Sequence, residues 1–136
     1  MAAVAAIYPE LQQLGAEVLA ISTDSVYAHK VFTEVSPSAR KVQFPLLSDR
    51  TQAICRAYRA LNVKTGASFR VSTIVNPEGV IAAKLVYPPD VGRNVYEILR
   101  MMEALIFNRQ TGAGAPANWM PGQEGIIRDP KLIGTI

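Results

Sequence analysis

The amino-acid sequence predicts an α/β domain in which helices pack on a short sheet that is mainly parallel. An apolar run, Val18–Ile21, stands between two segments of helical periodicity. Two segments rich in β-branched residues, 69–75 and 80–86, flank a turn and predict a β-hairpin. Strands that alternate with helices are typical of parallel sheets, and the hairpin adds an antiparallel element. Only these three strands are strongly indicated, which is few for a sheet of this class.

The N-terminal segment predicts a helix followed by a buried strand. Residues 1–14 place apolar side chains on one helical face, and Pro9 predicts either a kink or a fresh helix start within it. Gly15 is placed as a C-terminal stop. The strand within 16–23 is expected to be buried on both faces, because its apolar residues do not alternate with polar ones.

Two further helices are expected before the hairpin. Asp24 or Ser25 can cap the first of them. Its inner face is expected to hold Ala28, Val31, Phe32 and Val35. Residues 36–47 predict a loop with a short extended piece, and Asp49 can cap the next helix. The inner face of that helix is expected to hold Ile54, Ala57, Tyr58 and Leu61.

The second half of the chain predicts a hairpin, a long helix and an irregular arm. Asn, Pro and Gly at the first, second and fourth positions of 76–79 are typical of a type I turn. Asn94 and Glu97 predict the N-terminal cap of the helix that follows. Its inner face is expected to hold Val95, Ile98, Leu99, Met102 and Leu105.

The length allows one domain with a single core. We expect this core to span residues 1–107, and the Gly- and Pro-rich residues 108–136 to form a C-terminal arm anchored by Trp119.

The composition excludes several classes of function. The net charge is +3, and the basic residues are scattered without a long run, which argues against a nucleic-acid groove. With one cysteine, Cys55, and one histidine, His29, neither a disulfide nor a transition-metal cluster is expected. No apolar stretch is long enough for a membrane span, so a soluble protein of the reducing cytoplasm is expected. No phosphate-binding glycine pattern follows a strand, which argues against a nucleotide-binding domain.

Several stretches resemble one family in order and spacing. They are LGAEVLAISTDSVYAH at 14–29, FPLLSDRTQAICRAYRAL at 44–61, FRVSTIVNPEGVI at 69–81 with YPPDVGRNVYEILRMMEAL at 87–105, and PANWMPG at 116–122. The second is similar to the segment "FPLLSD…AYG.L" of the peroxiredoxins of the alkyl hydroperoxide reductase/thiol-specific antioxidant family. The sequence of residues 87–105 looks closer to the one-cysteine and archaeal-type branch of that family than to its two-cysteine branch.

The resemblance implies a thioredoxin-like fold, with a mixed sheet and flanking helices, that is N-terminally truncated. The family's Pro-x-x-x-Thr-x-x-Cys motif, which carries the peroxide-attacking cysteine, has no match in this sequence. In relatives it lies directly before the segment that matches the start of this chain. Ala115 occupies the position of the resolving cysteine of two-cysteine relatives. The implied activity is antioxidant thiol-dependent peroxide reduction by a longer form, with a hydroperoxide substrate, an external thiol reductant and no cofactor or metal. The 136-residue chain alone is expected to be inactive.

Two arginines are the candidate catalytic residues. Arg70 matches the family's active-site arginine, which stabilises the thiolate and the peroxide, and Arg93 matches a second arginine behind it. A guanidinium suits this task because its fixed charge and its fork of donors hold oxygen atoms. The alternative for Arg70 is a strand-end arginine that reaches solvent, and for Arg93 a basic residue without a special partner. Cys55 is not expected to be the nucleophile, although Arg56 and Arg59 are near enough in sequence to lower its pKa.

A second class of function stays open at this point. A sheet with few strands leaves unpaired edges and an apolar face, which predicts a homo-oligomer or a non-catalytic assembly module.

Overall fold

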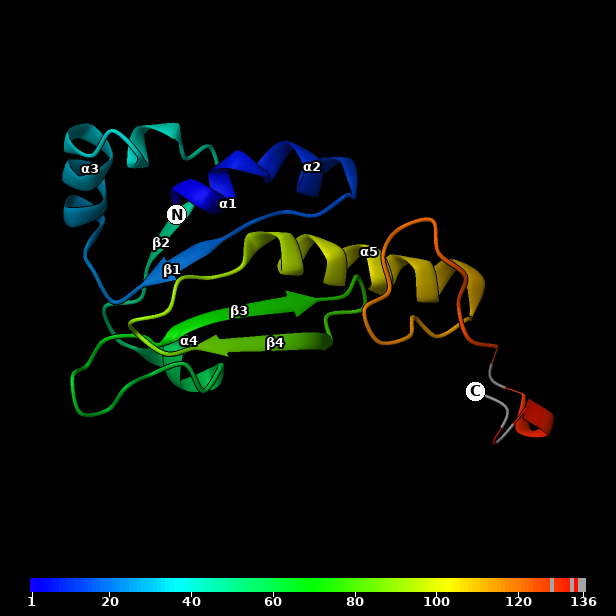
Figure 1. Cartoon of the computed structure of the whole chain (residues 1–136). Coiled ribbons are helices and arrows are strands. Elements are labelled where there is room, and N and C mark those ends of the chain that lie inside the picture. Colours follow the sequence, from blue (N-terminus) through cyan, green and yellow to red (C-terminus); the bar gives the residue numbers. More distant parts are fainter. Residues whose placement is uncertain (128, 133, 135–136) are drawn as a thin grey trace. The chain divides into compact units, whose positions relative to one another are not determined.

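The computed structural model describes residues 1–127, 129–132 and 134. The chain falls into two compact units, Met1–Val95 and Tyr96–Ile136. The first unit holds all four strands, and the second holds most of the long C-terminal helix with the arm (Figure 1). The predicted division into a core of residues 1–107 and an arm of residues 108–136 stays a prediction.

Two short helices, α1 (Ala2–Ala6) and α2 (Tyr8–Gln13), form the first segment. Pro9 lies in the first turn of α2, so the fresh start predicted there is confirmed. Gly15 has φ of 74°, and this left-handed conformation ends the helix as predicted. The buried residues of the segment are Ile7, Tyr8 and Leu11.

The first ladder pairs β1 (Ala20–Ser22) with β2 (Leu46–Ser48) in parallel. β2 is the short extended piece expected in the loop. The prediction that β1 is buried on both faces is wrong, since Leu19 is exposed and the strand is only half-buried. Among the described strands β1 has one neighbour, so one of its edges carries no partner strand to help cover its side chains.

Helix α3 (Val26–Val35) begins after Ser25, whose Oγ accepts a hydrogen bond from the Ala28 backbone N–H at 3.1 Å. Of the two caps considered, Ser25 is therefore the one used. Asp24 instead accepts a hydrogen bond from the Ser22 hydroxyl at 2.8 Å.

The predicted inner face of α3 is wrong, because its apolar side chains are exposed. Four of the exposed apolar residues form a stripe along the helix, which we call the α3 stripe: Tyr27, Val31, Phe32 and Val35. The half-buried residues are His29 and Thr33. His29 Nε2 lies 2.7 Å from Ser22 Oγ of β1, so a polar contact orients the helix against its ladder and turns the apolar residues outward.

The N-cap residue of helix α4 (Ala53–Ala57) is Gln52, whose side chain makes no capping hydrogen bond, and the capping role predicted for Asp49 is filled by its side chain from three residues earlier. The buried Asp49 carboxylate accepts hydrogen bonds from the backbone N–H groups of Ile54 at 3.2 Å and Cys55 at 2.7 Å. The inner face predicted for this helix is wrong: Ile54 and Tyr58 are exposed, and Cys55 is buried. The cap decides this orientation, since it draws Cys55 toward Asp49.

The predicted hairpin is confirmed as β3 (Arg70–Val75) and β4 (Ile81–Tyr87), which pair antiparallel. Gly79 N–H donates to the carbonyl of Asn76 at 2.9 Å and closes the turn. The β1–β2 and β3–β4 ladders are not hydrogen-bonded to each other among the described residues. Each of the four strands therefore keeps one unpaired edge within that part of the chain.

The long helix α5 (Val95–Thr111) is confirmed in place, but the expectation that the irregular arm begins at residue 108 is wrong, because residues 108–111 form the last turn of this helix. Val95 is buried, and the other predicted inner residues of this helix are half-buried. Two 3₁₀ helices, η1 (Ala39–Lys41) and η2 (Pro130–Leu132), complete the described elements.

Candidate active site

Arg70 is held by a backbone carbonyl and faces solvent. It is the first residue of β3 and pairs with Tyr87 of β4. Its Nε donates to the carbonyl oxygen of Pro89 at 2.7 Å, which ties the guanidinium to the loop after β4. The side chain is exposed, and within the described ranges its terminal nitrogens have no hydrogen-bond partner. The fork of donors is therefore oriented and available.

Arg93 lies close to Arg70 and is half-buried. Its Nη2 donates to the carbonyl of Val71 at 3.4 Å. Burial lowers the pKa of Arg93, and the charge of Arg70 lowers it further. A guanidinium nevertheless stays charged at all physiological pH values. Two positive charges thus stand within repulsion distance of each other, an arrangement that attracts an anion.

The amino group of Met1 is a third cation beside this pair. Partial burial lowers its pKa, and Arg93 and then Arg70 lower it further. The first residue of the chain therefore lies within electrostatic range of both guanidiniums.

Cys55 has the environment of a structural thiol. The pKa of Cys55 is raised to about 11. Burial is the main cause, and the Asp49 carboxylate, which accepts a hydrogen bond from the thiol, acts in the same direction. The expectation that Arg56 and Arg59 lower this pKa is wrong, since both side chains are exposed and the dominant causes act in the opposite direction. A thiol of this kind is protonated at neutral pH and a poor nucleophile.

Two features are absent from the part of the chain that the structure describes. No three His, Cys, Asp or Glu side chains gather there in a way that could hold a metal ion. None of the described helices has the length and apolar character needed to cross a bilayer.

Comparison with known proteins decides the family. The AhpC/TSA family matches residues 1–84. The chain belongs to this family. It is 36% identical to Peroxiredoxin 2 of Thermoplasma acidophilum over 128 residues, which cover 93% of this chain and 64% of that protein. It is 34% identical to alkyl hydroperoxide reductase C of Pseudomonas aeruginosa, covering 95% of this chain and 70% of that protein. It is also 34% identical to thioredoxin peroxidase of Fasciola hepatica.

Solved structures of the family share the fold. AhpC of Enterococcus faecalis superimposes with a TM-score of 0.80 at 32% identity, over 82% of this chain and 66% of that one. The reduced 2-Cys peroxiredoxin of Plasmodium vivax gives a TM-score of 0.82 at 29% identity, over 91% and 65%. The fold of the chain is thus thioredoxin-like, as predicted. The chain spans 64% of the length of Peroxiredoxin 2 of Thermoplasma acidophilum, which is less than two thirds. Archaeal and bacterial peroxiredoxins both match, so the assignment to the one-cysteine and archaeal-type branch stays a prediction.

Ala115, which the resemblance places at the position of the resolving cysteine, lies in the part of the arm that the structure describes. Ala115 is half-buried and follows Gly114, whose N–H donates to the carbonyl of Ile126 at 2.8 Å. The reverse hydrogen bond, from Ile126 to Gly114, is 2.7 Å long. These two hydrogen bonds join Gly114 to Ile126 and close residues 115–125 of the arm into a loop.

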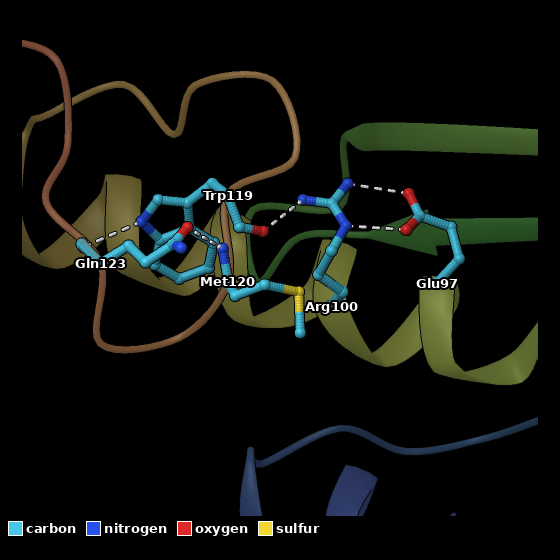
Figure 2. Close-up of polar contacts among 5 residues, drawn as sticks. All are labelled: Glu97, Arg100, Trp119, Met120 and Gln123. Carbon is cyan, nitrogen blue, oxygen red and sulfur yellow. Dashed lines mark hydrogen bonds and ion pairs between the residues drawn. The ribbon is translucent and has the colours of Figure 1, made fainter.

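The arm is fastened by Trp119, as predicted, and by contacts that the sequence did not indicate. Trp119 is only 2% exposed, and its ring centroid lies 4.8 Å from that of Phe107 on α5. Its indole Nε1 donates to the carbonyl of Gln123 at 3.0 Å. Figure 2 shows how Gln123 also accepts, through its Oε1, a hydrogen bond from the backbone N–H of Met120 at 2.8 Å.

Arg100 is the residue of this cluster that sequence reasoning missed. Its Nη1 donates to the carbonyl of Trp119 at 3.1 Å, and its Nε and Nη2 bind both oxygens of Glu97 at 2.7 and 2.8 Å (Figure 2). Glu97 was predicted as a capping residue, and the spacing of three to Arg100 was the available signal for the ion pair. We call Arg100, Phe107, Trp119 and Gln123 the arm clasp.

Proposed function

We propose that this chain is the arginine-bearing part of a thiol-dependent peroxidase that reduces hydrogen peroxide and organic hydroperoxides. The observation that carries the proposal is the pair of Arg70 and Arg93, two guanidiniums that are tethered to carbonyls and meet no carboxylate among the described residues. The names of the relatives, peroxiredoxin and alkyl hydroperoxide reductase, support the same reaction.

In this proposal a cysteine thiolate of the longer form attacks one peroxide oxygen. The S–O bond forms as the O–O bond breaks, the sulfur is oxidised to a sulfenic acid, and the leaving oxygen takes a proton to give water or an alcohol. Arg70 stabilises the thiolate and the leaving oxygen with the donors that its tether to Pro89 leaves available. Arg93 adds positive potential behind it, and its half-buried position makes that potential stronger than it would be in bulk water.

The thiolate would enter from the amino end of α1. The proximity of the Met1 amino group to both arginines supports this, because a segment joined to that end would lie beside them. An external thiol, of thioredoxin type or a small molecule, would then condense with the sulfenic acid to a mixed disulfide and release water. A second thiol of the reductant would displace the cysteine from that mixed disulfide, so that the cysteine is regenerated and the reductant leaves as a disulfide. The name of the Fasciola hepatica relative, thioredoxin peroxidase, supports a reductant of the first type. A reducing compartment such as the cytoplasm belongs to the same proposal.

A coupled peroxide-consumption assay tests this function. We expect the 136-residue chain to give only background consumption, and a longer form that carries a Pro-x-x-x-Thr-x-x-Cys segment before residue 1 to turn over. Cys55→Ser in the 136-residue chain is the control and should change nothing. Turnover by the short chain that this substitution abolishes would make Cys55 the nucleophile, and an inactive longer form would refute the peroxidase.

We also propose that the protein assembles into a homo-oligomer, and a purely non-catalytic assembly role is the alternative to the peroxidase. Exposed apolar side chains on the α3 stripe and an unpaired edge on each described strand support self-association. Sedimentation of the wild type and of Val31→Glu separates the cases. A larger species that the substitution dissociates supports assembly through α3, and a compact wild-type monomer refutes it.

A further inference from the structure

Three exposed cations meet at the C-terminal end of α4, outside the site of Arg70 and Arg93. Arg59 N–H donates to the carbonyl of Arg56 at 2.9 Å, which keeps the two residues on one turn. Lys84 of β4 reaches across and donates through Nζ to the carbonyls of Tyr58 at 2.7 Å and Arg59 at 3.2 Å. We call Arg56, Arg59 and Lys84 the α4 basic patch. All three side chains are exposed.

The charge of this patch is not balanced by its surroundings. The sequence contains no Asp or Glu between Arg50 and Asn76. Among the described residues no carboxylate pairs with the patch, and Arg56 Nη2 donates to the neutral amide oxygen of Gln52 at 3.3 Å. A cluster of uncompensated, exposed cations raises the local concentration of anionic groups.

Arg59 adopts a strained backbone conformation. Its φ is 48°, in the left-handed region where a side chain costs conformational energy and glycine does not. It directly follows the last turn of α4, the position at which helices most often place glycine. Residues in this conformation cluster at functional sites. The local fold would be better served by glycine at this position, so the guanidinium itself is the feature to explain.

Apolar groups beside the patch indicate what kind of partner fits. Ile54 and Tyr58, four residues apart on α4, are 37% and 40% exposed. An inorganic anion would gain nothing from these side chains, whereas a protein segment that alternates acidic and apolar residues would contact both kinds of group. Tyrosine and arginine are also among the residues that contribute most to protein interfaces.

We propose that the α4 basic patch, with Ile54 and Tyr58, binds an acidic amphipathic segment of another protein. The inference does not depend on the peroxidase function, because it uses neither Arg70 nor Arg93.

The test uses the full chain and a fluorescein-labelled synthetic peptide rich in Glu and Leu as the probe. Fluorescence anisotropy should report binding that weakens as salt screens the charges. Arg56→Glu should weaken binding about tenfold, the size expected for reversing one interfacial charge. The matched control is Lys30→Glu on α3, an exposed lysine that undergoes the same change of charge and should leave the affinity within about twofold.

Arg59→Gly separates the proposed role from a structural one. The substitution removes the strain, so the thermal unfolding midpoint should rise, and it removes the cation, so binding should weaken severalfold. Unchanged affinity in Arg59→Gly, or a lowered midpoint, would overturn the proposal. Equal weakening of peptide binding by Lys30→Glu and Arg56→Glu would show that only the net charge of the protein matters. That result would also overturn the proposal. Tighter binding of single-stranded DNA or inorganic phosphate than of the peptide at the same salt would refute the proposed class of partner.

Discussion

Arginines in two regions of the molecule are held in opposite ways. On α5, Arg100 binds both oxygens of Glu97 and a backbone carbonyl of the arm, so its charge is compensated. At the start of β3 and in the loop after β4, Arg70 and Arg93 are held by carbonyls alone, and no carboxylate meets them among the described residues. A compensated guanidinium fastens structure. A guanidinium that is oriented but uncompensated keeps its capacity to bind an incoming anion.

This difference predicts that substitutions in the two regions act on different properties. Those in the arm clasp should change stability, and those at Arg70 should change chemistry with little effect on stability.

The largest effect on stability is expected for Trp119→Ala. The buried indole packs on Phe107 and bonds to Gln123, so its removal should lower the free energy of unfolding by about 3 kcal/mol or more. Urea denaturation followed by far-ultraviolet circular dichroism measures this loss. Trp119→Phe retains an aromatic ring and should lose only about 1 kcal/mol, the value of the missing hydrogen bond. Equal losses in the two variants would show that packing does not hold the arm.

A smaller effect is expected for Arg100→Ala. It removes a partly exposed ion pair and the hydrogen bond to the Trp119 carbonyl, which together should contribute about 1 kcal/mol. Amide hydrogen exchange in the arm should accelerate in the same variant. Arg70→Ala is the matched comparison and should leave the free energy of unfolding within about 0.5 kcal/mol. A loss at Arg70 as large as that at Arg100 would remove the distinction between the two regions.

The smallest effect is expected at Cys55 and appears only at alkaline pH. Its pKa is raised in the folded chain to about 11, so the protonated thiol stabilises the fold below the pKa of about 8.5 that an unfolded cysteine has. This contribution should be lost as pH rises from there toward 11. The difference in unfolding midpoint between wild type and Cys55→Ala should therefore shrink over that range. A difference that is constant with pH would show that the thiol is not held by burial and Asp49 as described.

Local signals in the sequence predicted the elements well. The Asn76–Gly79 turn, the restart of α2 at Pro9 and the Asp49 cap depend on residues near in sequence, and all three are confirmed. The left-handed residue at the end of α4 also had a local signal, since Arg59 stands where the family segment "AYG.L" has glycine.

Faces and long-range contacts could not be read from the same patterns. An apolar stripe indicates that one face of a helix can be buried, but it does not say against which element. The α3 stripe is exposed in the described part of the chain. Arg100 meets Trp119 only because the arm folds back on α5, and Lys84 meets α4 only through the hairpin. The candidate arginines were named from resemblance. What the structure adds is their proximity and their tethers to carbonyls.

The central claim is that the uncompensated pair of Arg70 and Arg93 serves a thiolate. The most direct measurement is the pKa of the peroxide-reactive thiol in the longer form, read together with its rate of peroxide reduction, in wild type, Arg70→Gln and the matched Arg100→Gln. The account predicts that Arg70→Gln raises the thiol pKa by about one unit or more and slows the reaction about 100-fold, while Arg100→Gln changes neither. A thiol pKa and a rate that are both unchanged in Arg70→Gln would contradict it.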